Sequence, residues 1–229
     1  MIELLDKVNL DTYIEWINKC YIAARVCYSK KSIKELRKEA EEKTLKEKED
    51  FLDNKIFSKG HWSILEHVNL TFVMEDVSRS LTHQQVRHRH LSYSQKSQRY
   101  CKLETNEDFI IIPDNLKNNK NVEMITNDLR EYISNIQQNL AELGFKEEDI
   151  RFIYPNGTKT TLVITGNLRA IIEVMNKRLC SRAQSEIRKE FEELKNILKQ
   201  KLPKGNIITK YMIPKCKFCT EKEDCKINT

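Results

Sequence analysis

Three short apolar runs, separated by long stretches with helical periodicity, restrict the folds open to this chain. The runs Asn69–Met74, Phe109–Ile112 and Thr160–Thr165 are rich in branched and aromatic residues, and Pro113 stops the second. Such runs are typical of buried strands, whereas the segments between them repeat apolar residues at helical spacing. Because the 229 residues contain no internal repeat and no linker-like segment, we predict one α+β domain with few strands and many helices, spanning residues 1–229.

Helices are expected around the first strand. Residues 10–27 repeat apolar residues at helical spacing, with Asp11 as the expected N-cap. Residues 32–52 are rich in Lys and Glu, and we interpret them as a solvated helical stretch with ion pairs between residues four apart. Residues 78–90 are predicted to form the next helix.

Three more helices are expected in the second half of the chain. Residues 129–143 carry apolar side chains on one face, and Gly144 is suited to end that helix. Asn167 is a suitable N-cap for a helix after the third strand. Ser181 and Gln184 form a capping-box pattern for the last one.

Composition is that of an ordinary soluble protein. Hydrophobic residues make up 39% of the chain and charged residues 32%. No apolar run approaches the roughly 20 residues that cross a bilayer. The segment Met1–Asp6 carries acids where a signal peptide requires a basic region. We therefore expect a cytoplasmic protein without a membrane partner, and the net charge of +6 adds a mild bias toward anionic ligands.

The seven cysteines cannot all pair within one chain, because their number is odd. Four of them stand in apolar or helical patterns and are expected to be packing thiols: Cys20, Cys27, Cys101 and Cys180. The other three, Cys216, Cys219 and Cys225, lack the fourth ligand of a structural zinc site. We therefore predict no metal, and a reduced, partly mobile tail over residues 215–229.

The segment Arg87–Tyr100 is the most informative part of the chain for function. It holds three arginines, two histidines, three serines and two glutamines, no acidic residue, and Leu91 as its one aliphatic side chain. Arginine is suited to two-pronged binding of phosphate and similar oxyanions. In an extended segment, Gln95, Ser97 and Arg99 would point to one side. The segment therefore indicates a wall for an anionic ligand, a nucleic-acid contact or a structural hydrogen-bond network.

This segment resembles the signature of the flavin-dependent thymidylate synthases, with Arg-His-Arg followed by Ser-Gln-Arg-Tyr. The upstream segment Gly60–His67 is similar to that family's histidine-containing flavin segment. Downstream, Arg151, Asn167-Leu168-Arg169 and Arg178 follow in the family's order and approximate spacing. The resemblance runs from about residue 60 to about residue 190, and four separate motifs in register make a chance match improbable.

The resemblance implies a fold and a reaction. The fold would be a small, mainly antiparallel sheet surrounded by helices. The reaction would be methylation of dUMP to dTMP, with methylenetetrahydrofolate as carbon donor and FAD, reduced by NADPH, as hydride source. It also implies a homotetramer with FAD sites shared between subunits and no nucleic-acid partner. No G-x-G-x-x-G motif is present, so the FAD would not occupy a Rossmann site.

The resemblance also assigns residues to roles. Arg178 would contact the uracil ring and is the predicted catalytic residue; its alternative is an arginine that interacts with a helix C-terminus. For Arg151 the alternative is a surface ion pair with Glu148. The predicted substrate-binding residues are Gln84, Gln85, Val86, Arg87, Gln95, Lys96, Ser97, Gln98, Arg99, Arg151 and Arg178.

A second set would contact the flavin. Its members are His61, Ser63, Arg87, His88, Arg89, Gln95, Asn167, Leu168, Arg169 and Glu173. Gln95 stands where some relatives carry a carboxylate, and Glu173 where some carry Asn, so these two positions depart from the family pattern. The resemblance further implies that no cysteine acts as a nucleophile.

Overall fold

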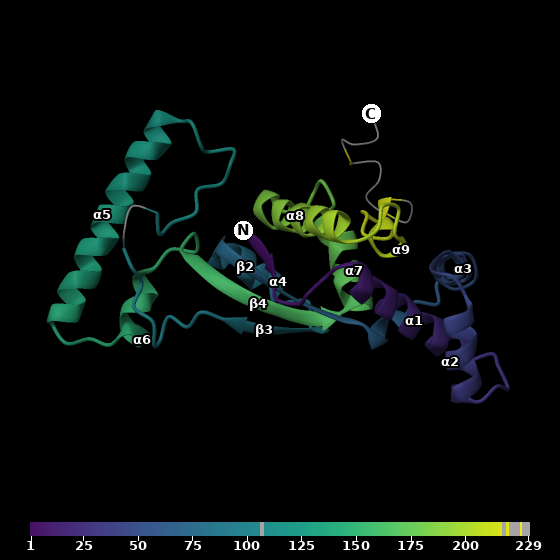
Figure 1. Ribbon diagram of the computed structural model, residues 1–229. Helices are drawn as coiled ribbons and strands as arrows, with labels where there is room; N and C mark the ends of the chain where they lie inside the picture. Colours follow the sequence, from purple (N-terminus) through teal and green to yellow (C-terminus); the bar gives the residue numbers. More distant parts are fainter. Residues whose placement is uncertain (106–107, 217–218, 220–224, 226–229) are drawn as a thin grey trace.

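An antiparallel sheet forms the centre of the molecule (Figure 1). The computed structural model describes residues 1–105, 108–216, 219 and 225. Within this part of the chain the sheet has four strands in the order β1-β2-β4-β3. Their bounds are Ile2–Leu4 for β1, Asn69–Ser78 for β2, Leu91–Gln95 for β3 and Lys159–Asn167 for β4. The predicted α+β class, with a small antiparallel sheet among helices, is confirmed.

Register in the sheet follows the alternation of apolar side chains. Phe72 of β2 and Tyr93 of β3 both pair with Ile164 of β4. Along β2, Leu70, Phe72 and Met74 are fully buried, because alternate side chains of a strand point to one face. Helices pack against the sheet and complete one large hydrophobic core. One face of the sheet therefore belongs to this core, and the segments that carry the candidate site leave the ends of its strands.

The first helix, α1 (Leu10–Val26), begins two residues earlier than its predicted cap implies. The Asn9 side chain accepts from the Thr12 amide, so Asn9 is the N-cap and the prediction of Asp11 was wrong. The charged stretch 32–52 contains two helices, α2 (Ile33–Glu42) and α3 (Leu45–Phe51). Thr44 is the N-cap of α3 and forms a capping box of its own. This cap divides the segment 32–52, which the charge pattern predicted as one helical stretch.

Helix α4 (Arg79–Gln85) ends well before residue 90, so the predicted helix 78–90 was too long. The chain turns through Arg87–His90 and continues as β3. We did not predict this strand, because its residues are mostly polar and it lies at the edge of the sheet. The extended backbone does not reach Arg99, which lies in a turn, so the predicted alternation of Gln95, Ser97 and Arg99 was wrong for Arg99.

The long helix α5 (Lys120–Glu142) stands away from the sheet at one end of the molecule (Figure 1). We call residues 96–105 and 108–157 the arm. The apolar run Phe109–Ile112 lies in the arm and is not the predicted strand: Ile110 makes one isolated bridge with Thr158. Phe109 and Ile110 are buried against Ile133 of α5 in a second, small core, which explains their apolar character. Gly144, with a φ of 84°, follows α5 as predicted.

The remaining helices are α6 (Glu147–Ile150), α7 (Leu168–Arg178), α8 (Ser185–Lys201) and α9 (Ile207–Lys210); short 3-10 and π turns, among them η3 (Ser63–His67), connect other elements. Asn167 caps α7 by accepting from the Ala170 amide, as predicted. The prediction of a capping box formed by Ser181 and Gln184 was wrong. Gln184 itself is the N-cap of α8, and its side chain accepts from the Ile187 amide.

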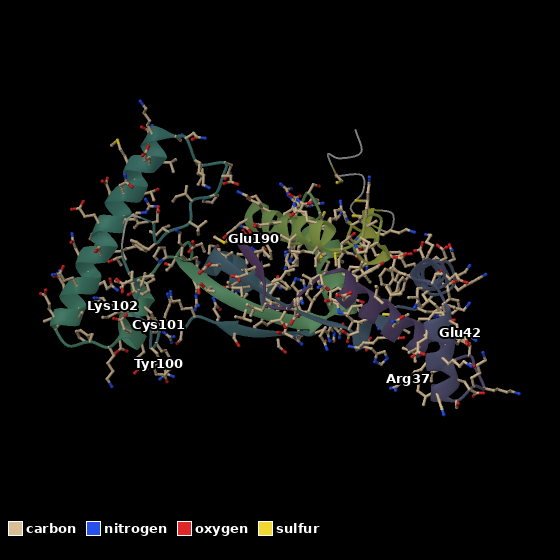
Figure 2. The ribbon with its side chains drawn as sticks, in the orientation of Figure 1. Arg37, Glu42, Tyr100, Cys101, Lys102 and Glu190 are labelled. Carbon is tan, nitrogen blue, oxygen red and sulfur yellow. The ribbon has the colours of Figure 1, made fainter. Side chains whose placement is uncertain are left out.

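The cysteines only partly follow their predicted role as packing thiols. Cys20 is buried as predicted, Cys180 is half-buried, and Cys27 and Cys101 are exposed, so the prediction was wrong for these two. Figure 2 shows Cys101 between Tyr100 and Lys102 near the α6 end of the arm. Most of the predicted tail 215–229 lies outside the described residues. No helix in the described part of the chain is long and apolar enough to cross a membrane.

Candidate active site

Arg178 is the last residue of α7, and it is half-buried against the turn that follows α4. Its Nε donates to His88 Nε2 at 2.9 Å, Nη2 donates to the Gln84 carbonyl oxygen at 3.1 Å, and Nη1 lies 3.4 Å from Gln84 Oε1. These partners are neutral, unlike the carboxylates that pair with other arginines of the chain. Among the described residues, no carboxylate pairs with Arg178, so its positive charge is not neutralised there.

His88 is the neutral acceptor that this arrangement requires. Burial, followed by the charges of Arg178 and Lys177, lowers the pKa of His88 to about 4. The imidazole is consequently uncharged at neutral pH and can accept the Arg178 Nε–H through Nε2. A protonated His88 would lose this hydrogen bond and repel the guanidinium.

A cavity of about 220 Å³ lies between the turn and α7. Arg87–Leu91 line one side, and Ala170, Glu173, Val174 and Lys177 line the other. Arg87, Arg89 and Lys177 are exposed, so this small hollow is dominated by positive charge. An anionic group such as a phosphate or pyrophosphate fits such a lining, because guanidinium groups bind oxyanions through paired N–H donors.

Arg169 joins α7 to the segment that carries His61. Its Nη1 donates to Glu66 of η3 at 2.6 Å, and its Nε donates to Glu173 at 3.0 Å. His61 and Ser63 are exposed on the same connection, immediately before and at the start of η3. The structure therefore gathers most of the residues assigned to the flavin around α7, η3 and the turn.

Three residues of the predicted substrate-binding set, Ser97, Arg99 and Arg151, lie in the arm. Arg99 donates through Nε and Nη2 to Glu148 of α6, at 3.0 and 2.8 Å, and Ser97 Oγ accepts from the Arg99 amide. Glu148 therefore pairs with Arg99. The alternative for Arg151, a surface ion pair with Glu148, is not what the structure shows. Arg151, at the end of α6, lies over the Phe152 ring.

Arg79 is a candidate residue that the sequence did not reveal. It is the first residue of α4 and half-buried, and the pKa of its guanidinium is lowered by burial and by the nearby charge of Arg151. Two arginines in proximity, with no carboxylate paired to either among the described residues, indicate an anion site. A basic residue in the first turn of a helix opposes the macrodipole, and this signal could have identified it.

Several predicted ligand-binding residues are turned away from solvent. Gln85 and Leu168 are fully buried, so their side chains cannot contact a ligand in this conformation. Gln95 donates to Thr82 Oγ1 at 2.9 Å, which directs its amide toward α4. Val86 and Lys96 are exposed beside the turn and beyond β3, and Gln98 is half-buried. We interpret Gln85 and Leu168 as supports of the site.

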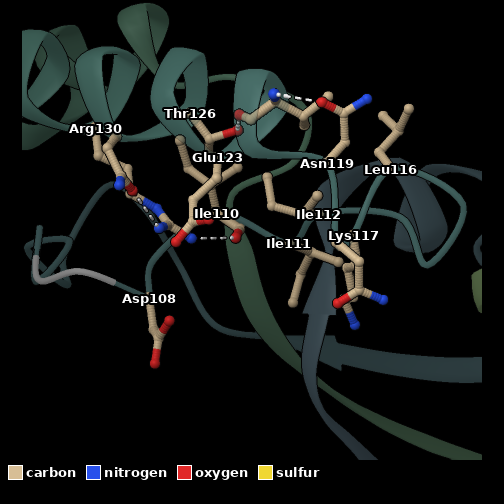
Figure 3. A pocket seen from close by; sticks show the side chains of 13 residues that line it. Asp108, Ile110, Ile111, Ile112, Leu116, Lys117, Asn119, Glu123, Thr126 and Arg130 are labelled. Carbon is tan, nitrogen blue, oxygen red and sulfur yellow. Dashed lines mark hydrogen bonds between the residues drawn. The ribbon is translucent and has the colours of Figure 1, made fainter.

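A larger cavity lies elsewhere. It has a volume of about 440 Å³ and lies in the arm, between α5 and the segment 108–119 (Figure 3). Ile110, Ile112 and Leu116 supply apolar walls, and Arg130 lies at one end, where its Nη2 donates to the Ile110 carbonyl oxygen. None of the residues assigned to dUMP or flavin lines this cavity. It is therefore separate from the site around Arg178.

Comparisons with known proteins identify the family of this chain. The family model described as thymidylate synthase complementing protein matches residues 10–204. The flavin-dependent thymidylate synthase of Clostridium tetani is 38% identical over 209 residues, covering 85% of this chain and 81% of that protein. The enzyme of the same name from Pyrococcus horikoshii is 39% identical over 175 residues, covering 74% and 72%.

A solved structure has the same fold. Thymidylate synthase X from Helicobacter pylori, crystallised with FAD and dUMP, superposes with a TM-score of 0.62 at 23% identity, covering 85% of this chain and 91% of that chain. The family model spans most of this chain, and relatives above 30% identity span more than two thirds of it. The chain therefore belongs to the family of flavin-dependent thymidylate synthases.

Proposed function

We propose that this protein converts dUMP to dTMP by reductive methylation at C5 of the uracil ring. Methylenetetrahydrofolate would donate the carbon, and NADPH would reduce the bound FAD. The observation that carries the proposal is the Arg178 guanidinium, which is half-buried and held by the neutral partners His88 and Gln84. Such a charge can stabilise the negative charge that develops on a pyrimidine when C5 becomes nucleophilic.

The dUMP molecule would lie between Arg178 and the arginines near the arm. Arg178 would donate to the uracil oxygens, while Arg79, Arg151 and Arg99 would bind the phosphate with Ser97. Arg79 and Gln84 lie on the same short helix, α4, about five residues or roughly 8 Å apart along its axis. This separation is consistent with one nucleotide spanning both ends of the helix. To bind phosphate, Arg99 would exchange its contact with Glu148.

FAD would bind along α7, η3 and the turn that carries Arg87–His90. The cationic lining of the cavity at Arg87, Arg89 and Lys177 suits its pyrophosphate. When bound, FAD supplies the hydride that the substrate carbon requires. The protein side chains bind and orient the reactants: Arg178 holds the ring, and His88, fixed in its neutral form, holds Arg178.

We also propose that the protein is a homotetramer with FAD sites shared between subunits, located in the cytoplasm. An exposed apolar stripe on α5 supports self-association. Ile125, Leu129 and Tyr132 are 66%, 40% and 65% exposed, and Leu143 beyond the helix is 74% exposed. Ile125, Leu129, Tyr132 and Ile136 are separated by four, three and four residues, and Leu143 follows seven residues later. This spacing is typical of a helix that packs against another helix.

An omission experiment tests the proposed reaction. Purified protein is incubated with dUMP, methylenetetrahydrofolate, NADPH and FAD, and dTMP is separated by chromatography. We expect dTMP in the complete mixture and none when dUMP, methylenetetrahydrofolate or NADPH is left out. Protein stripped of FAD should regain activity when FAD is returned. Formation of dTMP at the full rate by FAD-free protein would contradict the proposal.

A further inference from the structure

The position of Arg178 depends on a short turn. Its guanidinium donors point to groups of two residues, the Gln84 carbonyl and amide oxygens and His88 Nε2. Both residues lie where α4 ends and the chain reverses toward β3. Any movement of this turn would therefore displace the acceptors that orient the guanidinium.

The Tyr93 hydroxyl fixes this turn from the sheet. It lies 2.8 Å from the Gln85 carbonyl oxygen and 2.9 Å from the His88 carbonyl oxygen, and it can donate to either. The pKa of Tyr93 is raised to about 12 by burial, so the hydroxyl keeps its proton at neutral pH. One side chain thus contacts both the start and the end of the turn.

The ring of Tyr93 is itself held in place. Tyr93 pairs with Ile164 in the β3–β4 ladder, and its half-buried ring packs against the main core. Gln85 gives the turn less support: its Nε2 lies 3.4 Å from the Tyr93 hydroxyl, and its buried Oε1 has no hydrogen-bond partner among the described residues. A continuous path therefore leads from the sheet through the Tyr93 hydroxyl and the turn to Arg178.

We propose that Tyr93 is a positioning residue for catalysis: its hydroxyl, bonded to the Gln85 and His88 carbonyl oxygens, fixes the turn in which Gln84 and His88 orient the Arg178 guanidinium. This inference rests on the proposed function, since Arg178 is the residue that would contact the uracil. Misplacing a catalytic group by about 1 Å can reduce a rate by roughly 100-fold. Loss of the hydroxyl should therefore reduce kcat more than it weakens the binding of dUMP or FAD.

The test compares Tyr93→Phe with Tyr154→Phe. Tyr154 is also half-buried and its hydroxyl is also hydrogen-bonded, to Gln137 Nε2, but it belongs to the small core of the arm. We expect Tyr93→Phe to fold, to retain FAD, to keep KM for dUMP within about threefold and to lower kcat by roughly 10- to 100-fold. Tyr154→Phe should retain kcat.

A double variant separates positioning from a general structural effect. In an Arg178→Ala background, Tyr93→Phe should cause little further loss, because the group that it positions is absent. An unchanged kcat in Tyr93→Phe, an equal further loss in the Arg178→Ala background, or failure of the variant to fold would overturn the proposal.

A readout without turnover distinguishes this inference from the proposed function. Labelling by phenylglyoxal, followed by mass spectrometry of the peptide containing Arg178, reports how firmly the guanidinium is held. Tyr93→Phe should label several-fold faster than wild type and Tyr154→Phe at the wild-type rate. If wild type makes no dTMP but labelling still responds, the function fails and the geometric link stands. If labelling does not respond, the link fails.

Discussion

At the residue scale, the site contains arginines in two electrostatic states. Arg99 and Arg169 are paired with carboxylates, whereas Arg178 contacts neutral acceptors and Arg79 lies near the like charge of Arg151. Within the described part of the chain, Arg178 and Arg79 are not paired with a carboxylate, so their charge is available to a ligand. This difference suggests which substitutions affect substrate binding and which affect the local fold.

Arg79→Ala and Arg151→Ala should weaken the binding of dUMP. A charge-assisted hydrogen bond contributes about 1.5–3 kcal/mol, so each variant should raise the Kd roughly 10- to 100-fold. Isothermal titration with dUMP and with deoxyuridine checks this, because deoxyuridine lacks the phosphate and should bind variants and wild type equally. Arg37→Ala, an exposed arginine of α2 (Figure 2), is the control. Equal weakening of both ligands would remove these residues from the phosphate site.

The cysteines should be dispensable for the reaction. Cys101 is exposed on the arm and Cys180 is half-buried two residues after Arg178, and neither lies among the groups that contact Arg178. We expect Cys101→Ala and Cys180→Ala, singly and together, to retain most of the rate of dTMP formation. Loss of activity in a folded, FAD-loaded variant, with a covalent dUMP adduct found on wild type by mass spectrometry, would show that a thiol participates.

At the scale of elements, the strands and helix starts that could be predicted from the sequence are those set by an apolar pattern or a local cap. Strands β2 and β4 follow from branched apolar runs, and Asn167 follows from its suitability as an N-cap. Strand β3 was missed because an edge strand needs only one apolar side, and Phe109–Ile112 was misassigned because its apolar residues pack on α5. Arg79 was missed although a basic residue in the first turn of a helix is a sequence signal; its proximity to Arg151 is visible only in the fold.

The contact between α7 and η3 leads to a prediction about FAD affinity. Glu173 and Glu66 share the Arg169 guanidinium, and an incoming anion must compete with both carboxylates. Glu173→Asn should therefore tighten FAD binding, by up to about fivefold, since exposed ion pairs contribute about 0.2–1 kcal/mol. Quenching of flavin fluorescence on reconstitution measures the Kd, with Glu42→Asn on α2 as the control. Weaker binding would indicate that Glu173 contacts the cofactor directly.

At the scale of the whole molecule, the arm and its exposed apolar stripe require an explanation beyond one chain. If α5 packs against another subunit, Leu129→Glu and Tyr132→Glu should place charge in that interface and shift the protein toward smaller assemblies. Light scattering after size exclusion measures the mass. Gln138→Glu, on another face of α5, should leave the assembly unchanged. An unchanged mass in the first two variants would exclude this stripe as an interface.

The central claim is that the hydride used to make dTMP comes from FAD at a site organised by Arg178. Protein containing reduced FAD is mixed without oxygen with dUMP and methylenetetrahydrofolate, and flavin oxidation is followed by absorbance while dTMP is quantified. We predict one dTMP for each FAD oxidised in wild type, and a loss of roughly 100-fold or more in the rate for Arg178→Ala with FAD still bound. Formation of dTMP without flavin oxidation, or an unchanged rate in Arg178→Ala, would contradict the account.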